Sequence, residues 1–230
     1  MTSQYFAFIR HGDYHQMSGA PSAYQPFGLT EDAKIQVAES LDILEEIVVE
    51  QGFVLNPVID SSTLLRAWQT AEIYRENLDG VKRVNSFDCL AERGVGAVAN
   101  LTTDAIEQIL EDDPRFEAPP ENWKSNSHYR LPFIGAESLM EAGARVAKHV
   151  RDTLRKQTVK EGEKQLKLFV GHGAAFRHAA HHLGVLSFDE IAKLSMYHSS
   201  PVVFELNKLG KYHHVAGNWK IRTPKEGFTD

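Results

Sequence analysis

Short apolar segments alternate with longer amphipathic segments along this chain, and two of the apolar segments end in the same way. Residues 4–10, QYFAFIR, lead into His-Gly at 11–12, and residues 164–171, KQLKLFVG, lead into His-Gly at 172–173. Apolar and aromatic runs of this length that stop near glycine are typical of buried β-strands. Strands that alternate with helices form a mainly parallel sheet with helices packed against it. The pattern therefore predicts an α/β fold.

Five segments after the first strand carry apolar residues at helical spacing. They are 30–51, 63–77, 102–112, 136–157 and 174–183. Thr30 is a suitable N-cap for the first of them, and Gly52 is a suitable end. Further strands are expected at 56–62 and around 81–84, and the alternating residues 200–218 predict an antiparallel hairpin. We therefore expect a three-layer α/β/α sandwich, a mostly parallel sheet with helices on both faces and a C-terminal antiparallel hairpin.

Residues 94–136 form the least regular part of the chain. They carry four aromatic residues that a flexible linker would not need, Phe116, Trp123, Tyr129 and Phe133. We expect this segment to form a cap-like insertion over the sheet. A chain of 230 residues is within the range of a single α/β domain, so one domain over 1–230 is expected.

Charge and composition exclude several classes of partner. The formal net charge of -6 and the pI near 6.0 disfavour nucleic acid or an anionic membrane as the main partner. No apolar run approaches the roughly 18 residues of a membrane span. Cys89 is the one cysteine, which prevents an intrachain disulfide and fits a reducing compartment. The N-terminus lacks the pattern of a signal peptide, so a cytoplasmic location is expected.

Charged and imidazole side chains gather at the predicted strand ends. Arg10 and His11 end the first strand, and His172 ends the later one. Because open α/β sheets bind ligands at the carboxyl ends of their strands, we expect both histidines to face one pocket. Arg66 lies in the first turns of a predicted helix, and Glu92 lies in a loop before the insertion. Guanidinium groups match phosphate oxygens and imidazole is a nucleophile near neutral pH, so this set predicts a cationic phosphate pocket with one carboxyl group.

Four short motifs occur in a recognisable order along the chain. They are R-H-G at 10–12, S-x-x-x-R-A-x-x-T-A at 62–71, E-R-G at 92–94 and H-G at 172–173. Residues 135–139, G-A-E-S-L, add a fifth similarity. Each motif is weak alone, but together they resemble the histidine phosphatase superfamily, the phosphoglycerate mutase-like proteins, over the whole chain. This resemblance implies the phosphoglycerate mutase-like form of the expected fold.

The resemblance also implies a mechanism that needs no metal and no cofactor. His11 would attack phosphorus in line and become a phosphohistidine. Arg10, Arg66 and His172 would bind the phosphoryl oxygens and offset the charge of the transition state. Glu92 would protonate the leaving oxygen and then accept a proton from the water that hydrolyses the intermediate. His11, Glu92 and His172 are thus the expected catalytic residues.

The acid is the assignment with the most alternatives. Asp13 follows R-H-G directly, and Glu137 lies in the G-A-E-S-L segment, so either carboxylate is an alternative to Glu92. We prefer Glu92 because it aligns with the acid of the family. The plainer interpretation of Glu92 is a surface carboxylate paired with Arg93.

Five further residues are candidates for substrate contact: His15, Tyr14, Trp123, Arg130 and His198. The first two follow R-H-G, Trp123 and Arg130 lie in the insertion that family members use as a cap, and His198 lies near a predicted strand end. For the histidines the alternative is an ordinary loop position, and for the residues of the insertion it is packing onto the sheet.

Two other polar groups have structural explanations that compete with functional ones. Arg66 could form an ion pair with a carboxylate such as Asp60. His178 and His182 have the i, i+4 spacing of zinc ligands. Ala179 stands where a zinc-protease helix has glutamate, so we prefer surface and helix-packing roles for these histidines and predict no metal site.

The residues after R-H-G distinguish two branches of the family. Phosphohistidine-forming mutases resemble R-H-G-E/Q-S-x-W-N, whereas this chain has RHGDYHQMSG, in which Asp13, Tyr14 and Met17 replace polar residues. A phosphatase that hydrolyses a phosphorylated small molecule or a phosphoprotein is therefore our first interpretation. Mutase-type phosphoryl transfer is the second. A non-catalytic phospho-ligand binding or scaffold protein on the same fold is the alternative from another class.

Overall fold

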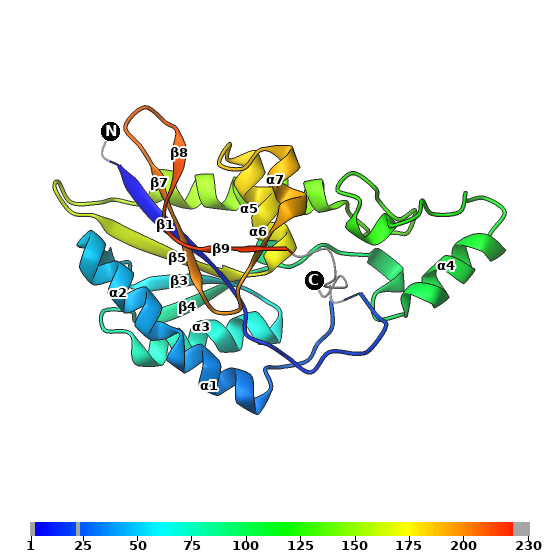
Figure 1. The fold of residues 1–230 in the computed structure, drawn as a ribbon, viewed down its shortest axis with the longest axis horizontal. Coiled ribbons are helices and arrows are strands. Elements are labelled where there is room, and N and C mark those ends of the chain that lie inside the picture. Colours follow the sequence, from blue (N-terminus) through cyan, green and yellow to red (C-terminus); the bar gives the residue numbers. More distant parts are fainter. Residues whose placement is uncertain (1–2, 22–23, 223–230) are drawn as a thin grey trace.

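A mixed seven-stranded sheet forms the centre of the computed structural model, which describes residues 3–21 and 24–222. Its strands are β1 Gln4–Arg10, β2 Val54–Leu55, β3 Val58–Ser62, β4 Arg83–Phe87, β5 Gln165–Gly171, β7 Pro201–Leu206 and β8 Tyr212–Gly217. The strand order is β4-β3-β5-β1-β7-β8, with the short β2 paired to β5. The first strand of the chain therefore lies in the middle of the sheet, between two late ones (Figure 1).

The sheet is mostly parallel, which confirms the expected fold class. β1 runs parallel to β5, and β3 runs parallel to both β4 and β5. β7 runs antiparallel to β1 and to β8, so the predicted C-terminal hairpin is present. The parallel pairing brings the carboxyl ends of β1, β3 and β5 to the same edge.

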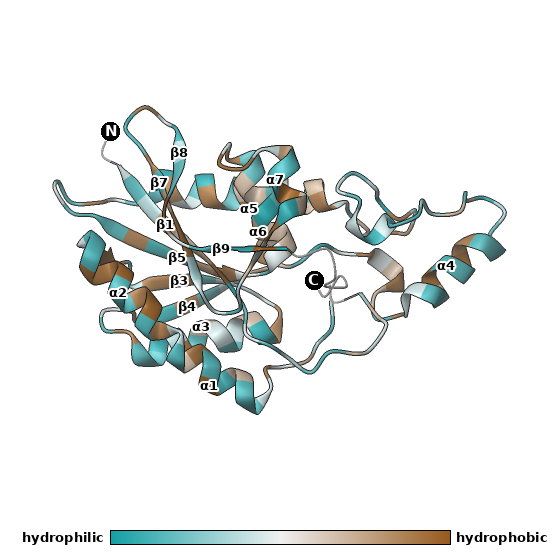
Figure 2. Ribbon diagram, viewed as in Figure 1, coloured by the Kyte–Doolittle hydropathy of each residue, from teal (hydrophilic) through white to brown (hydrophobic). Residues whose placement is uncertain are grey.

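Helices cover both faces of the sheet (Figure 1). They are α1 Glu31–Glu39, α2 Leu41–Gln51, α3 Leu65–Asn77, α4 Thr103–Asp112, α5 Leu139–Lys156, α6 Gly173–His182 and α7 Phe188–Lys193. Teal and brown residues alternate along α1 and α2, as expected for helices with one face on a core (Figure 2). Among the described residues, no helix is both long and apolar enough to cross a membrane.

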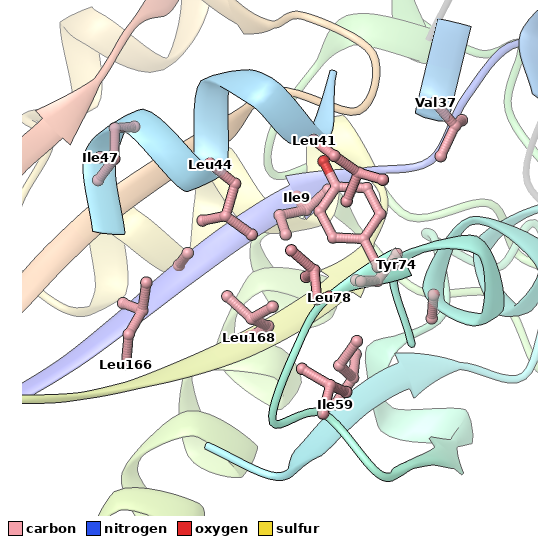
Figure 3. Close-up of a cluster of buried hydrophobic side chains, with 14 of the residues drawn as sticks. Ile9, Val37, Leu41, Leu44, Ile47, Ile59, Tyr74, Leu78, Leu166 and Leu168 are labelled. Atoms are coloured by element: carbon pink, nitrogen blue, oxygen red, sulfur yellow. The ribbon is translucent and has the colours of Figure 1, made fainter. Parts of the chain in front are cut away.

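Each face of the sheet has its own hydrophobic core. α1, α2 and α3 pack on one face in a core of mainly aliphatic side chains, which includes Val37 and Leu44 of the helices and Ile59 and Leu168 of the strands (Figure 3). α5 and α6 pack on the other face around phenylalanine rings, where Phe8 and Phe176 stack with their centroids 4.3 Å apart. These two layers hold the sheet rigidly beneath the strand ends.

The structure divides the first predicted helix into α1 and α2 at Ser40. The Ser40 hydroxyl donates to the Val37 carbonyl at 2.7 Å, and its backbone N–H donates to the Gln36 carbonyl at 2.9 Å. A serine that bonds back to the preceding turn favours a helix end. Gly52 ends α2 in the left-handed conformation, with φ 66°, as the sequence predicted.

Several elements differ from the prediction. The strand expected around 81–84 lies slightly later, as β4. The sequence analysis missed α7 and a separate two-stranded sheet that joins β6 Leu194–Met196 to β9 Trp219–Ile221. Strands of three residues are too short to show the alternation on which strand prediction depends.

Residues 94–136 form a separate, smaller apolar cluster beside the sheet. They contain α4 and two short 3-10 helices, η2 Gly96–Val98 and η3 Trp123–Ser125. The two ends of the segment meet, because Val95 pairs with Ala136 and the Ala97 N–H donates to the Ile134 carbonyl at 3.0 Å. The cluster contains Val95, Val98, Ile106, Leu110, Trp123, Leu131 and Ala136. α4 lies far from the sheet, at the right of Figure 1.

Candidate active site

The ends of β1 and β5 bring His11 and His172 together. Arg10 pairs with Gly171 in the parallel register, and the His11 N–H donates to the Gly171 carbonyl at 2.9 Å. The centroids of the two imidazole rings are 5.0 Å apart. The exposed fractions are 5% for His11 and 0% for His172. The two histidines therefore form one buried pair, as the strand-end argument predicted.

Arg66, in the first turn of α3, contacts both histidines. Its Nε donates to His11 Nε2 at 3.1 Å, and its Nη2 lies 3.3 Å from His172 Nδ1. The side chain is fully buried, and its Nη1 donates to the Gln25 carbonyl at 3.0 Å. The Tyr14 ring lies beneath the guanidinium, 4.4 Å from Cζ. A single guanidinium thus joins the two imidazoles to the loop after β1.

Arg66 does not form the alternative ion pair with Asp60, because the Asp60 carboxylate has other partners. The Asp60 carboxylate accepts from Lys167 Nζ at 2.6 Å and lies 2.9 Å from His149 Nε2. Lys167 comes from β5 and His149 from α5, so Asp60 joins the sheet to the helix that covers it. Arg66 bonds to the two histidines instead.

Arg10, the last residue of β1, lies against the start of α6. Its Nη1 donates to the Met196 carbonyl at 3.1 Å. A Cβ atom on Gly173 would lie 3.2 Å from Arg10 Cδ and 3.3 Å from Nε, closer than a side chain normally packs. The glycine after His172 therefore lets the arginine approach the beginning of the helix.

Hydrogen bonds fix the tautomer of each imidazole. His11 Nδ1 lies 2.6 Å from the Gly12 carbonyl, so Nδ1 carries the proton and Nε2 accepts from Arg66. His172 Nδ1 faces the Arg66 donor, so its Nε2 carries the proton, which it donates to Ser62 Oγ at 2.9 Å. His11 Nε2 is therefore the nitrogen with a lone pair directed into the site.

Burial and nearby positive charge keep both imidazoles neutral. Burial, followed by the charges of Arg66, His172 and Arg10, holds the pKa of His11 well below its ordinary value of 6.5. Burial and then the charges of Arg66, Arg10 and Arg145 lower the pKa of His172 in the same way. A neutral imidazole with an available lone pair is the nucleophilic form.

Glu92 lies at the N-terminus of α6, next to His172 in the site. Its Oε1 accepts the N–H groups of Arg93 at 2.9 Å and Ala175 at 3.1 Å, and its Oε2 accepts that of Ala174 at 3.2 Å. The side chain is buried, and it touches the backbone of Arg93, not the guanidinium. These three donors suit the ionised carboxylate.

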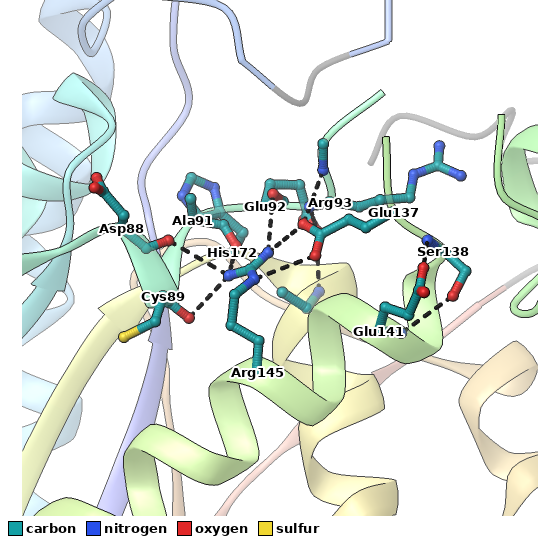
Figure 4. A network of polar contacts seen from close by, with 12 residues as sticks. Asp88, Cys89, Ala91, Glu92, Arg93, Glu137, Ser138, Glu141, Arg145 and His172 are labelled. Atoms are coloured by element: carbon teal, nitrogen blue, oxygen red, sulfur yellow. Dashed lines mark hydrogen bonds and ion pairs between the residues drawn. The ribbon is translucent and has the colours of Figure 1, made fainter. Parts of the chain in front are cut away.

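Arg145 of α5 holds the loop that carries Glu92 (Figure 4). Its Nη1 donates to the carbonyls of Cys89 at 2.8 Å and Ala91 at 3.0 Å, and its Nη2 donates to the Glu92 carbonyl at 3.4 Å. Glu137 binds the same guanidinium and accepts the Gly94 N–H at 3.0 Å. Arg145 and Glu137 together anchor both ends of this loop.

The two alternative carboxylates lie in different surroundings. Glu137 is engaged with Arg145 as described, away from the histidine pair. Asp13 is exposed, and its Oδ1 accepts the N–H of the adjacent Tyr14 at 2.9 Å. Of the three candidates, Glu92 is the one that bonds to the first turn of α6, directly after His172.

The five candidates for substrate contact divide into two groups. Tyr14 and His198 have rings close to His11, with centroids 5.5 Å and 5.9 Å away. Trp123 packs inside the insertion, where its indole N–H donates to Glu107 at 2.8 Å, and Arg130 is exposed and paired with Glu141 at 3.3 Å. His15 is an exposed loop residue whose backbone N–H bonds to the Gly28 carbonyl.

The i, i+4 histidines on α6 make packing contacts. His178 Nδ1 lies 2.7 Å from the Ala174 carbonyl and its Nε2 lies 3.0 Å from Ser127 Oγ, while His182 Nε2 lies 2.9 Å from the Met140 carbonyl. Within the part of the chain that the structure describes, no group of three or more His, Cys, Asp or Glu side chains is arranged to hold a metal ion.

Sequence reasoning missed three contributors to the site. Ser62 lies in the quoted R-A motif, so its position was available as a signal. Gln25 contributes through its backbone carbonyl, and Arg145 mainly through backbone carbonyls of another segment. Every residue has a backbone carbonyl, so such contacts cannot be predicted from the residue types of the partner segment.

Comparison with known proteins identifies the family of this chain. The model of the histidine phosphatase superfamily (branch 1) matches residues 6–217. The chain belongs to this superfamily. It is 26% identical over 205 residues to a 2,3-bisphosphoglycerate-dependent phosphoglycerate mutase of Parvibaculum lavamentivorans, and the match covers 88% of this chain and 90% of the relative. Superfamily members are phosphatases or mutases, so the protein is an enzyme of this general kind.

Solved structures of lower identity share the fold of this chain. A mycobacterial glucosyl-3-phosphoglycerate phosphatase superposes with a TM-score of 0.65 at 19% identity, covering 95% of this chain and 98% of that one. YhfR of Bacillus stearothermophilus superposes with a TM-score of 0.66 at 21% identity, covering 93% and 96%. At these identities the likeness concerns the architecture.

Proposed function

We propose that this protein is a metal-independent phosphatase that hydrolyses a phosphomonoester through a phosphohistidine on His11. The observation that carries the proposal is the Arg66 guanidinium, which donates to His11 Nε2 and faces His172 Nδ1 inside one buried pocket. A phosphoryl group in this pocket would take over those donors. We further propose that residues 1–230 act as one domain, with 94–136 as its cap.

In the first half of the reaction, His11 Nε2 attacks phosphorus and the bond from phosphorus to the ester oxygen breaks. The N–P bond forms with the Nε2 lone pair, which the Nδ1–H bond to the Gly12 carbonyl directs. Arg10 and Arg66 bind the equatorial oxygens and compensate the charge of the transition state. His172 adds a donor when Arg66 turns to the phosphoryl group, because its ring can then carry the proton on Nδ1 while Nε2 accepts from the Ser62 hydroxyl. Glu92, entering in its protonated form, gives its proton to the leaving alkoxide, which departs as an alcohol.

In the second half, water attacks the phosphohistidine and the N–P bond breaks. Glu92 is now ionised, the form that its three N–H donors suit, and it accepts the proton of the attacking water. The electron pair of the N–P bond returns to His11 Nε2. Inorganic phosphate leaves, and both His11 and Glu92 are back in their starting forms.

Mutase-type transfer is a second candidate, because a curated relative covering most of the chain is a phosphoglycerate mutase. Two features favour hydrolysis. The residues after Gly12 depart from the mutase pattern, and Met17, where a mutase has asparagine, is exposed at 41%. A mutase would need a bisphosphorylated primer for turnover and would hydrolyse simple esters weakly.

The test is hydrolysis of p-nitrophenyl phosphate in EDTA by the wild type and by His11→Ala. We expect metal-independent turnover that His11→Ala abolishes, because the nucleophile is removed. Rapid quenching of the wild type at alkaline pH should give a protein mass increased by one phosphoryl group, which acid removes. Activity that survives His11→Ala would overturn the proposal. Inactive wild type that binds phosphate esters would point to the non-catalytic alternative.

A further inference from the structure

A continuous series of hydrogen bonds leads from the insertion to the carboxylate of Glu92. The Ser127 hydroxyl, in the segment that follows η3, lies 3.0 Å from Nε2 of His178 on α6. His178 Nδ1 lies 2.7 Å from the Ala174 carbonyl. This carbonyl belongs to the same peptide group as the Ala175 N–H, which donates to Glu92 Oε1 at 3.1 Å. Ser127 and Glu92 are thus joined through one imidazole and one peptide group.

Every hydrogen bond of this series points in the same direction. The Ala174 carbonyl can only accept, so His178 Nδ1 carries the proton and is the donor. Burial lowers the pKa of His178 to about 4, so the ring is neutral near pH 7 and its Nε2 is an acceptor. The Ser127 hydroxyl therefore donates to Nε2. All the donors are directed away from the insertion and towards the carboxylate.

Hydrogen bonds in series polarise one another. A donor on the carbonyl of a peptide group makes the N–H of the same group a stronger donor. The Ala175 N–H is one of the three that suit the ionised form of Glu92. His178 therefore stabilises the ionised carboxylate without touching it, and Ser127 adds to this effect.

Packing holds both members of the series in place. The exposed fraction of His178 is 1%, and a Cβ atom on Gly143 of α5 would lie 2.4 Å from the His178 Cβ. This close contact between α5 and α6 fixes the backbone that carries the imidazole. The Ser127 carbonyl accepts the Met140 N–H at 3.0 Å, at the start of α5. The first bond of the series therefore exists only while the insertion lies against these two helices.

We propose that Ser127 and His178 are positioning residues that set the balance between the protonated and the ionised form of Glu92. The inference rests on the proposed function, in which Glu92 acts first as an acid and then as a base. The series favours the ionised form, which the second half of the reaction needs. Because it begins in the insertion, it makes this balance depend on the place of the insertion against α6.

Other charged and titratable groups surround Glu92 and His178. Those around Glu92 and its loop are Arg66, Arg145, Arg93, Asp88, Glu137, His172 and Tyr24. Those around His178 on its own helix are Arg177, His181 and His182, and Lys124 and Arg222 lie across the cavity that adjoins both sites. Substitutions at Ser127 and His178 leave all of these groups in place. A change in the titration of Glu92 in such variants therefore reports on the hydrogen-bond series.

The titration of the Glu92 carboxyl group tests the proposal directly. In protein labelled with carbon-13 at the glutamate carboxyl groups, the Glu92 signal is assigned by its loss in Glu92→Gln, and its midpoint with pH is measured. Loss of the series should raise this midpoint, because the ionised form loses stabilisation. We expect a rise of about 0.3 pH unit or more in His178→Leu and of about 0.2 pH unit in Ser127→Ala.

Ser125→Ala is the matched control. Ser125 lies in η3, and its hydroxyl donates to the Asn122 carbonyl at 3.1 Å, not to α6, so this variant should keep the wild-type midpoint. Ser127→Thr keeps a hydroxyl group and should also keep it. Should His178→Leu fail to fold, because His178 is buried, Ser127→Ala and Ser127→Thr decide.

The same shift should appear in catalysis. In the pH profile of kcat/KM for butyl phosphate, the fall that follows loss of the acid's proton should move to higher pH in His178→Leu and in Ser127→Ala. A purely structural role would lower the whole profile without moving it along the pH axis.

Equal Glu92 midpoints in the wild type, His178→Leu and Ser127→Ala would overturn the inference and leave the proposed phosphatase function standing. A wild type that hydrolyses neither butyl phosphate nor p-nitrophenyl phosphate would overturn the proposed function. In that case raised midpoints would still support the action of the series on Glu92, because the carboxyl titration needs no turnover.

Discussion

Arg66 joins His11 and His172 through one planar guanidinium. Nε and Nη2 point at two different imidazoles, while Nη1 is held by the Gln25 carbonyl. The rigid fork of arginine suits this arrangement, because its donors keep fixed angles to one another. Lysine would supply a positive charge but no set of N–H donors at fixed angles. The geometry, more than the charge, distinguishes the residue at this position.

Arg66→Lys should therefore lower kcat/KM by about 10²-fold or more, the usual cost of losing an oriented donor to the transition state. Steady-state kinetics with p-nitrophenyl phosphate measures this. Arg75→Lys is the matched control, since Arg75 lies on the same helix and pairs with Glu72 away from the histidines. Arg66→Lys activity within a factor of about three of wild type would contradict the geometric argument.

The lowered pKa of His11 predicts how its ring titrates. Burial and then the charges of Arg66, His172 and Arg10 hold this pKa well below 6.5, so the ring should stay neutral as the pH falls through 6.5. Imidazole NMR signals, assigned by their loss in His11→Ala, measure this. In the unfolded chain the same ring binds a proton near pH 6.5, so its contribution to folding stability is lost as the pH falls below that value. A midpoint at 6.5 or above would contradict the prediction.

The loop from Cys89 to Gly94 contributes Glu92 but contains no long helix or strand to hold it. Arg145 of α5 supplies the missing support through the backbone carbonyls of Cys89, Ala91 and Glu92, and Glu137 completes the anchor at Gly94. Since Arg145 would act on the proposed acid, Glu92, through the loop, we infer that it is a positioning residue. Its loss should affect the proton transfer more than the binding of phosphate.

Arg145→Ala should lower kcat/KM for an alkyl phosphate at least about tenfold more than for p-nitrophenyl phosphate. The alkoxide needs a proton to depart, whereas p-nitrophenolate needs much less assistance, and general acids commonly contribute about 10²–10⁴-fold. Lys148→Ala changes an exposed residue of the same helix and should lower kcat/KM for neither ester. Equal losses for both esters in Arg145→Ala would indicate general unfolding of the site instead.

A buried ionic cluster holds the sheet to α5 and so affects the stability of the whole molecule. Asp60 of β3 binds Lys167 of β5 and His149 of α5. Burial lowers the pKa of His149, but hydrogen bonds to Asp60 and Cys89 outweigh it and raise this pKa to about 9. The protonated imidazole therefore stabilises the fold as long as it keeps its proton.

Because the folded pKa of His149 lies above the unfolded value of 6.5, its stabilisation is fully present below pH 6.5 and is lost as the pH rises through about 9. Urea unfolding at pH 6.5 and 9 should show a fall in the free energy of unfolding of about 2 kcal/mol that His149→Gln lacks. His214→Gln, at an exposed histidine of β8, is the control. An identical pH dependence in wild type and His149→Gln would contradict the assignment.

Much of this architecture was predictable because the decisive residues stand where strands end. His11 and His172 follow apolar runs directly, and parallel strands bring their ends to one edge. Arg66 was predictable from a motif. The helix break at Ser40 and the contacts of Arg145 with the loop at 89–92 could not be predicted. In both cases a side chain bonds to a backbone carbonyl, and every residue has one. The strands of the small β6–β9 sheet were too short to show a period.

The central position of β1 has a consequence for biosynthesis. Residues 4–10 leave the ribosome long before 165–171 and 201–206, yet β5 and β7 are the neighbours with which β1 pairs. Until those strands emerge, both edges of β1 lack partners and its apolar side chains lack cover. The sheet, and with it the pocket, therefore closes only after most of the chain has been translated. During that interval the exposed strand edges and apolar side chains favour aggregation, because distant pairings form slowly.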